Sequence, residues 1–564
     1  MSIISPSSQD NFTRARVICQ KNNMNDEEEV HMKFKKVLSM TLLAAMLATT
    51  LAACGNSGSG SSSGTKQESS SGSESGGTSS EGVTLPFAET QKYTMFSVIA
   101  GADYPLEENV AFQKLCNDAN IEFDIQSVLG ADLGEKKGLV LASGDYPDIF
   151  FKSGFSSAEM TKYGSQGVLI PLQDLIRQYA PNLTKLLDER DAWQYLQDQD
   201  GNVWSLPEVD RQDPGITVLW IDKKWMDELG LKEPTSLDEL YTVLKAFKDN
   251  DVNGNGDKND EIPFTANAGV TIDLLLPYFN LNYDHGTRTA IDGDKVVYVP
   301  TSDTYKEFLA YITKLYQEGI LDKNCFTQAH EQQGAIGQSG DIFGAFFDAG
   351  AFLTVGRDND DDYIALTPFT EGTYPVTSGI TPGTLCITDA CKNPEYIIAW
   401  ADQLYSQDGG ALAWLGVEGE TYEMADDGTW SWLLGKHGDD VSTVRASSTI
   451  QGTANHPSVQ PDIWYTGMTD ATDPDEVYLN GERAKLTAVG AKPRPAMFFS
   501  EADSQTLGSL NTDLNSYAEQ YKAQVATGEL DLESSWDEYV STMEAMGASQ
   551  VQEIYQNAYD GATK

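Results

Sequence analysis

The sequence predicts an α/β protein with more than one lobe, and three observations support this fold class. The chain has 564 residues, of which 40% are hydrophobic and 10% aromatic. This is enough apolar material for more than one core of ordinary size. From about residue 85 onward, apolar runs with the period of strands alternate with stretches of helical period, a pattern typical of layered α/β folds.

The first elements of the folded part are the clearest. We expect strands at 93–100, 121–128 and 148–151, separated by helices at 108–118 and 135–142, which together form a βαβαβ opening. Ser236, with Glu239 three residues later, forms a capping box that starts a helix running to about residue 248. Further helices are expected at 304–318, 393–406, 509–527 and 536–546.

Charge and cysteine content exclude several classes of partner and site. The chain carries 38 basic and 85 acidic residues, a formal charge of -47, so its field repels nucleic acid and anionic polymers and favours a neutral or cationic small ligand. An acidic surface also simply keeps a secreted protein soluble. The six cysteines form no CxxC pair and no zinc-like cluster, so we expect neither a disulfide scaffold nor a zinc site.

The N-terminal region reads as an export signal. A basic start at Met32 leads into an apolar run over 37–51 and then Leu51-Ala-Ala-Cys54, the pattern of a lipoprotein signal peptide (32–53) with Cys54 lipidated by palmitate-type chains. The run is short for a membrane-spanning helix of about 20 residues. Residues 1–31 are interpreted as a mis-annotated upstream segment, and the Ser/Gly-rich stretch 54–84 as a disordered tether.

The strongest local motif lies just after the helix that Ser236 starts. Oxygen-bearing side chains recur around two glycines in the order Asp251, Asn253, Asn255, Asp257, Asp260 and Glu261. Calcium takes about six to eight oxygen ligands, and loops of this composition supply them. The exit through Pro263 cannot continue as a helix, so the motif is not a true EF-hand. A turn that needs no metal is the alternative, but the crowded carboxylates favour a structural Ca2+ ion.

Several stretches resemble the carbohydrate-binding lipoproteins of bacterial ABC importers, a branch of extracellular solute-binding protein family 1. They are LASGDYPD (141–148), DGNVWSLP (200–207), WIDKKWMDELGL (220–231), PTSLDEL (234–240), the loop 251–263, GVEGETY (416–422) and WDEY (536–539). The resemblance runs from about residue 90 to 560. It also implies a calcium loop, which Asp251, Asn253, Asn255, Asp260 and Glu261 match, but one extra residue before Asp260 leaves open whether Asn259 or Asp260 faces the metal.

The resemblance implies a type II periplasmic-binding-protein-like fold, with two α/β lobes and a ligand cleft between them. Lobe 1 is expected at 85–215 with a return segment at about 368–410. Lobe 2 is expected at 216–367 and about 411–564. The first crossing between the lobes is placed near 215–221, and the return near 368–379.

Aromatic residues are the expected sugar contacts, because flat rings cover the apolar CH faces of sugars while polar neighbours pair with hydroxyl groups. The candidates in loops, strand ends or Gly-rich stretches are Trp204, Trp220, Phe352, Trp414, Tyr422 and Trp464, and Phe347 belongs to the same Gly and aromatic segment as Phe352. Ligands of open α/β sheets bind beyond the carboxyl ends of strands, which nominates Asp103, Tyr104 and Asp148. Core packing or ordinary capping is the alternative for each.

The expected function is capture rather than catalysis. No GxSxG, HExxH or P-loop motif is present, so the chain is not expected to be an enzyme. With the resemblance, the prediction is a monomeric, lipid-anchored solute-binding protein on the extracellular face of the cytoplasmic membrane. It captures a carbohydrate, expected to be a neutral oligosaccharide, and passes it to the permease subunits of an ABC importer. A ligand-sensing partner of a membrane receptor and a surface glycan-degrading enzyme are the alternatives.

Overall fold

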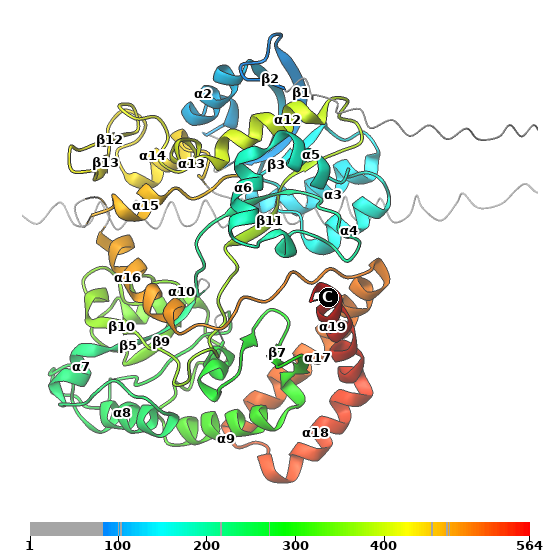
Figure 1. Ribbon diagram of the computed structural model, residues 1–564. Coiled ribbons are helices and arrows are strands. Elements are labelled where there is room, and N and C mark those ends of the chain that lie inside the picture. The colour runs from blue at the N-terminus through cyan, green and yellow to red at the C-terminus, as the bar shows by residue number, and fades with distance from the viewer. Residues whose placement is uncertain are drawn as a thin grey trace, which may run out of the picture. The chain divides into compact units, whose positions relative to one another are not determined.

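The computed structural model describes residues 83–99, 101, 104–214, 217–269, 271–452, 455–469, 472 and 474–563. Contacts gather the chain from Ser80 onward into one compact unit. Its buried apolar side chains form two large clusters and a smaller one. We call the part that surrounds the second and third clusters lobe 1 and the part that surrounds the first cluster lobe 2 (Figure 1). The predicted signal peptide, Cys54 and nearly all of the tether lie outside the described residues.

The core of lobe 1 is a five-stranded sheet in the order β2-β1-β3-β11-β4. Its strands are β1 (Gln91–Ile99), β2 (Ile121–Leu129), β3 (Ile149–Phe151), β4 (Leu206–Val209) and β11 (Ile380–Ile387). β1 pairs in parallel with both β2 and β3, whereas β11 is antiparallel to β3 and β4. The predicted βαβαβ opening is therefore confirmed, and the sheet is completed by a strand from much later in the chain.

Helices cover the lobe 1 sheet, and local capping explains where they begin and end. The Asn109 side chain accepts a hydrogen bond from the Phe112 amide, which starts α2, and Asn120 ends that helix in the left-handed region at φ 62°. The helices are α2 (Val110–Ala119), α3 (Leu133–Ser143), α4 (Ser157–Ser165), α5 (Gln173–Tyr179), α6 (Pro181–Glu189), α12 (Pro394–Asp402), α13 (Gln407–Trp414), α14 (Val441–Ser448) and α15 (Asp462–Thr466). A hairpin of β12 (Tyr422–Met424) and β13 (Trp430–Trp432) lies beside α13 to α15.

Lobe 2 is built on a smaller sheet in the order β10-β5-β9, with a separate meander of β6, β7 and β8. The strands are β5 (Val218–Asp222), β6 (Tyr283–Asp284), β7 (Thr289–Asp292), β8 (Lys295–Tyr298), β9 (Ala345–Asp348) and β10 (Tyr363–Ala365). The helices are α7 (Lys223–Glu228), α8 (Leu237–Asp249), the 3-10 helix η4 (Ile272–Phe279), α9 (Asp303–Gln317), α10 (His330–Gly337), α11 (Ala351–Val355), α16 (Pro474–Ala488), α17 (Glu501–Thr527), α18 (Leu532–Met546) and α19 (Ala548–Ala562). The short 3-10 helices are η1 (Leu106–Glu108), η2 (Gly130–Asp132), η3 (Trp193–Tyr195), η5 (Val299–Thr301), η6 (Asp360–Asp362) and η7 (Gln403–Tyr405).

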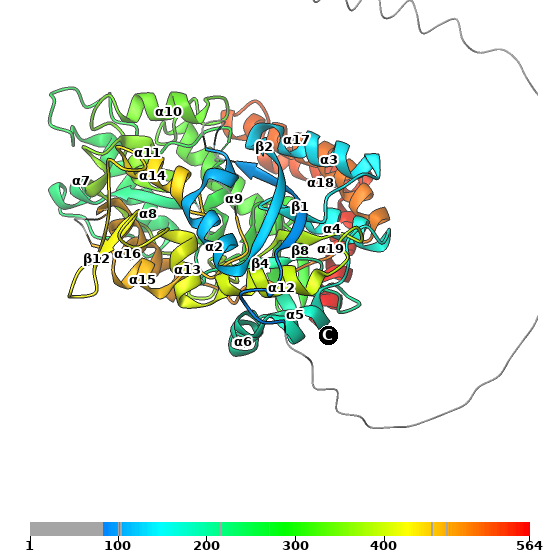
Figure 2. The same cartoon turned by 90° about the horizontal axis from the view of Figure 1, so that it is seen from above.

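Two predicted helices of lobe 2 differ from expectation in their first turns. Ser236 caps α8 by accepting from the Glu239 amide at 3.2 Å, but the Glu239 carboxylate bonds Thr235 and not the cap residue itself. α17 begins at Glu501 because Ser500 caps it, eight residues before the predicted start at 509. α17, α18 and α19 lie together at the C-terminal end of the chain, as Figure 2 shows from above.

The packing clusters divide the chain differently from the predicted lobes. Residues 413–468, expected in lobe 2, contribute side chains such as Trp414 and Ile450 to the lobe 1 cluster. Hydrophobicity alone carries no information on which core a segment joins. The chain passes from lobe 1 to lobe 2 between β4 and β5 and returns between β10 and β11. It enters lobe 2 again before α16, and the segment 489–500 then runs back to lobe 1, where Phe498 packs in the same cluster as Trp204. No helix in the described ranges is long and apolar enough to span a membrane.

Candidate functional site

Three segments that connect the lobes are hydrogen-bonded to one another. The Thr377 amide donates to the Asp213 carbonyl at 2.7 Å, and the Ala491 amide donates to the Tyr374 carbonyl at 2.7 Å. Near the end of the return segment, Gly379 has φ +72°, and a Cβ there would lie 2.4 Å from the Asp210 carbonyl oxygen. Only glycine permits this approach. We call the described residues of these segments (210–214 with 217, 366–379 and 489–500) the connecting segments.

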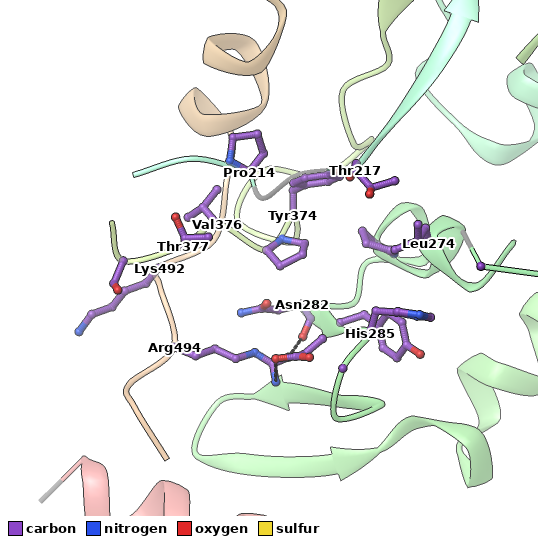
Figure 3. Close-up of a pocket in the computed structure, with 17 residues that line it drawn as sticks. Pro214, Thr217, Leu274, Asn282, His285, Tyr374, Val376, Thr377, Lys492 and Arg494 are labelled. Carbon is purple, nitrogen blue, oxygen red and sulfur yellow. Dashed lines mark hydrogen bonds and ion pairs between the residues drawn. The ribbon is translucent and has the colours of Figure 1, made fainter. Parts of the chain in front are cut away.

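A cavity of about 610 Å³ lies where the connecting segments meet lobe 2. Its walls are mainly apolar, and its charged and imidazole side chains, Asp284, His285, Lys492 and Arg494, come from β6, the turn after it and the third connecting segment (Figure 3). The lining residues are Pro214, Thr217, Gly269, Leu274, Pro277, Asn282, Tyr283, Asp284, His285, Gly286, Tyr374, Pro375, Val376, Thr377, Ser378, Lys492 and Arg494. A concave apolar site with a few converging polar groups is the usual form of a small-ligand site.

Arg494 joins the third connecting segment to the turn that carries the polar groups. Its guanidinium donates to the Thr289 hydroxyl at 3.0 Å, to the Thr289 carbonyl at 3.1 Å and to the Asn282 carbonyl. Burial lowers the pKa of Arg494, while nearby Asp284 acts in the opposite direction. These bonds fix the position of Asn282 at the cavity wall.

Three buried polar atoms on the cavity wall have no hydrogen-bond partner in the part of the chain that the structure describes. They are Asn282 Oδ1, His285 Nδ1 and Arg494 Nε. Burial lowers the pKa of His285, so the imidazole is neutral at pH 7. Leaving a buried polar atom unpaired costs about 1–3 kcal/mol. A ligand with hydroxyl groups would pair these atoms and recover part of that free energy.

The cavity floor is held from behind by a buried ion pair. η4 supplies Leu274 and Pro277 to the floor, and its Asp273 lies against Lys522 of α17, with 2.8 Å between Oδ2 and Nζ. The two side chains are 1% and 0% exposed. Desolvation opposes ionisation, but Lys522 and Arg288 hold the pKa of Asp273 below its usual range. The floor therefore depends on an ion pair whose cation, Lys522, comes from a helix much later in the chain.

None of the described residues predicted to bind ligand lines this cavity. Trp204, Trp220 and Trp414 are all buried, and each indole N–H already donates within the protein, to Asp198 Oδ2 at 2.8 Å, to the Asp348 carbonyl at 3.0 Å and to Ser458 Oγ at 3.2 Å. Buried tryptophans usually satisfy their indole N–H in this way, so these three side chains belong to the packed core.

The remaining predicted aromatic residues are also mostly buried. Phe347 is buried in β9, and Tyr422 packs in the lobe 1 cluster. Trp464 contacts Trp414, with 5.2 Å between ring centroids, so the structure does bring these two together, but inside lobe 1. Phe352 is only half-buried, and the Arg357 guanidinium lies 3.8 Å from its ring centroid.

The polar candidates in lobe 1 are separated by the length of the sheet. Asp148 directly precedes β3, so it lies at the amino end of that strand, where its carboxylate accepts from the Thr94 amide at 2.7 Å and hydroxyl at 2.8 Å. The prediction from sequence placed Asp148 beyond the carboxyl end of a strand, whereas the residue lies before its strand. Tyr104, which follows β1 at the carboxyl end, is half-buried. Asp103 lies outside the described residues.

The predicted metal loop follows α8 and is folded on itself. The Asp251 carboxylate accepts from the Gly256 amide at 3.0 Å, Asn253 Oδ1 from the Asn255 amide at 3.1 Å, and Asn255 Oδ1 from the Asp257 amide at 2.8 Å. Asn255 also donates to Asp260. These bonds draw the oxygen-bearing side chains together.

Glu261 supplies an observation that bears on a metal. One carboxylate oxygen accepts from the Val252 amide at 3.0 Å, while the other, Oε2, is buried with no partner among the described residues. Burial raises the pKa of Glu261. In those residues no three His, Cys, Asp or Glu side chains form a group that could hold a metal ion. Hard oxygen donors with one orphaned carboxylate oxygen fit Ca2+.

A model of the bacterial extracellular solute-binding protein family matches residues 97–411, more than half of the chain. The chain belongs to this family. The predicted family and α/β fold class are thereby confirmed, and the family is one of binding proteins rather than enzymes.

Individual relatives span nearly the whole chain. The fructooligosaccharide ABC transporter substrate-binding protein FusA of Streptococcus pneumoniae is 28% identical over 558 residues, which cover 94% of this chain and 99% of FusA. A solved structure of an HMO-binding, ABC-transporter-associated solute-binding protein from Bifidobacterium longum infantis matches with a TM-score of 0.71 at 22% identity, over 84% of this chain and 99% of that one. An EF-hand mutant of S. pneumoniae FusA in complex with fructo-nystose has a TM-score of 0.64 at 24% identity, with the same coverage.

The cavity residues were not predicted from the sequence, although one signal was present. Lys492 and Arg494 alternate with prolines in an extended run, and alternate residues of an extended chain lie on the same side. In a chain with so few cations, two on one side of one segment mark a polar face. Asn282 and His285 give no comparable signal, because turns commonly contain these residue types.

Proposed function

We propose that this protein captures an oligosaccharide outside the cell and delivers it to an ABC importer. The observation that carries the proposal is the cavity at the connecting segments, in which apolar walls surround buried polar atoms that have no partner among the described residues. Sugars suit such a site, because their CH faces pack on apolar surface while their hydroxyl groups form hydrogen bonds. The full-length similarity to FusA supports the same class of ligand.

The place of the cavity supports a role in transport. A ligand there touches all three connecting segments, through Thr217, Tyr374 and Arg494. Ligand binding then favours the lobe arrangement in which these segments contact it, which is how a binding event is converted into a closed form. A permease that accepts only the closed form would distinguish loaded from empty protein.

The roles of individual side chains follow from their free atoms. Asn282 Oδ1 accepts from a sugar hydroxyl, Arg494 Nε donates to one, and neutral His285 bonds a third. Leu274 and Val376 cover the apolar face of the sugar. Of the residues predicted from the sequence, Tyr104 and Phe352 stay candidates for contacts outside the cavity, because both are only half-buried.

Calorimetric titration tests the proposal. A thermal-shift screen with fructo-oligosaccharides, milk-type oligosaccharides and acidic glycans first identifies a ligand, since binding to the folded state raises Tm. Asn282→Ala and His285→Ala should then each weaken binding about tenfold or more. His437→Ala, on the loop after β13 and not among the residues that line the cavity, is the matched control and should bind as wild type. If no glycan of any class binds, the proposed function is wrong.

We further propose that the loop from Asp251 to Glu261 holds a structural Ca2+. The orphaned Glu261 oxygen and the converging Asp and Asn oxygens support this, and FusA is described with an EF-hand. The ion would neutralise crowded carboxylates beside the packed end of α8. The loop belongs to lobe 2, where Val252 packs in the first cluster, and none of its residues lines the cavity.

We also propose that the mature protein is anchored to the outer face of the cytoplasmic membrane through Cys54. The lipobox sequence supports the anchor, and the family of extracellular binding proteins supports the location. Cys54→Ala should move the protein from the membrane fraction to the medium. Retention of that variant in the membrane would contradict the lipobox interpretation.

A further inference from the structure

A second polar cluster in lobe 2 is centred on His330, the first residue of α10. His330 Nε2 lies 2.8 Å from Asp348 Oδ2 at the end of β9, and the Thr354 hydroxyl donates to the same oxygen at 2.6 Å. The Asp348 side chain is 6% exposed, whereas that of His330 is 39% exposed. A buried carboxylate therefore fixes the orientation of a ring that is open to solvent.

Two hydrogen bonds join α10, the helix that carries His330, to the cavity wall. Gln333, one turn after His330 and on the same face of α10, accepts at Oε1 from Asn267 Nδ2 at 2.6 Å. Asn267 in turn accepts at Oδ1 from the amide of Gly269, a residue that lines the cavity. Asp348 also pairs with Val218, the neighbour of Thr217 on the cavity wall. Two independent links thus place the cluster beside the cavity.

Free polar atoms give the cluster the capacity to bind. Because Nε2 faces the Asp348 carboxylate, Nδ1 is the ring nitrogen that is left for a further hydrogen bond, and it has no partner in the described ranges. Gln333 is fully buried, and its Nε2 donor has no partner there either. A free ring nitrogen of His330 and the unpaired donor of Gln333 match a group that carries hydroxyls, because a hydroxyl can both donate and accept a hydrogen bond.

We propose that His330, oriented by Asp348, contacts ligand in a second subsite that extends the cavity along lobe 2. This inference rests on the proposed function and deepens it. The subsite takes a hydroxyl-bearing sugar unit of an oligosaccharide too long for the cavity alone. The structure thereby assigns His330 a role in selecting ligand length.

The test is a titration series with one glycan type at increasing chain length. Kestose and fructo-nystose, with longer fructans, form the first series, and the best glycan type of the screen replaces them if fructans do not bind. The variants are His330→Ala and Asp348→Asn, with His437→Ala as the matched control, because His437 is also held by a carboxylate, at 3.2 Å from Glu420. Tm is measured for every variant.

Against the longer members, His330→Ala should lose about tenfold in affinity, while the shortest binder keeps its affinity within about twofold. Asp348→Asn should show the same length dependence with a smaller loss, since Asn still accepts from His330 and Thr354. The control should match wild type at every length.

Three results would overturn the inference while leaving the proposed function intact. They are an unchanged affinity at all lengths, an equal loss at all lengths with a lowered Tm, and a wild type that binds only one length. A wild type that binds no glycan would overturn the proposed function as well, so the two failures are distinguishable.

Discussion

Replacing Lys522 with Met tests how far the cavity floor depends on a buried charge pair. Met keeps most of the apolar length of Lys but leaves the Asp273 carboxylate, 1% exposed, without the cation 2.8 Å away. Removing one partner of a buried pair typically costs about 3–5 kcal/mol. Glu519, 2.7 Å from the same ammonium, is 38% exposed, so water screens it and its share of the cost is small.

Urea unfolding at pH 7 measures the effect, and the chain supplies a matched control. Lys306 Nζ also lies 2.8 Å from a carboxylate, that of Glu533, but the side chains are 28% and 77% exposed. Lys306→Met should leave the free energy of unfolding nearly unchanged. The double variant Lys522→Met with Asp273→Asn should recover much of the loss, because no buried charge then remains unpaired.

The same pair makes a prediction about pH with a definite sign. The folded pKa of Asp273 is held below its usual value of about 3.8, so its stabilisation is present above that pH and is lost as the pH falls further. If Lys522→Met unfolds at the same urea concentration as Lys306→Met, with equal slopes, the buried pair does not stabilise the floor and the reasoning fails.

Three further perturbations have expected outcomes. Burial raises the pKa of Asp222, which caps α7, to about 8. The contribution of Asp222 to stability therefore declines as the pH rises from about 4 to 8, at about 1.4 kcal/mol per pKa unit. Urea unfolding at several pH values should show that Asp222→Asn removes this decline. A chelator should lower the Tm of the wild type but not of Glu261→Gln, and an unchanged wild-type Tm would mean that the loop is only a turn. In urea unfolding, Gly383→Ala should lower the free energy of unfolding far more than Gly144→Ala does. Both glycines have positive φ, but only at Gly383 would a Cβ lie 2.1 Å from a backbone oxygen, that of Phe155.

Much of the fold was predictable because its signals are local. Strand and helix periods located β1, α2 and β2 to within two residues, and the Ser236 cap located the start of α8. Where local signals compete, the prediction shifted, as for α17, whose polar first turns hide its start until the Ser500 cap is recognised.

The site was less predictable because tertiary packing creates it. Pro214, Tyr374 and Arg494 meet only after the chain has passed between the lobes three times, and no pattern within one segment records that meeting. Tryptophan is also ambiguous in sequence, since the same indole suits a sugar platform or a core. The internal partners of Trp204 and Trp414 became visible only in three dimensions.

The position of β11 has a consequence for the order in which the protein can acquire its structure. This strand lies between β3 and β4, yet it is separated from β4 in sequence by most of lobe 2. A chain that emerges residue by residue therefore holds β4 without its neighbour until Ile387 has appeared, and closing such a long loop is entropically slow. A fragment that ends before Ile380 lacks the strand that joins β3 to β4, so the five-stranded sheet cannot form. The two lobes are therefore not encoded by two separate stretches of the gene. A single recombination event between two such genes cannot exchange lobe 1 alone.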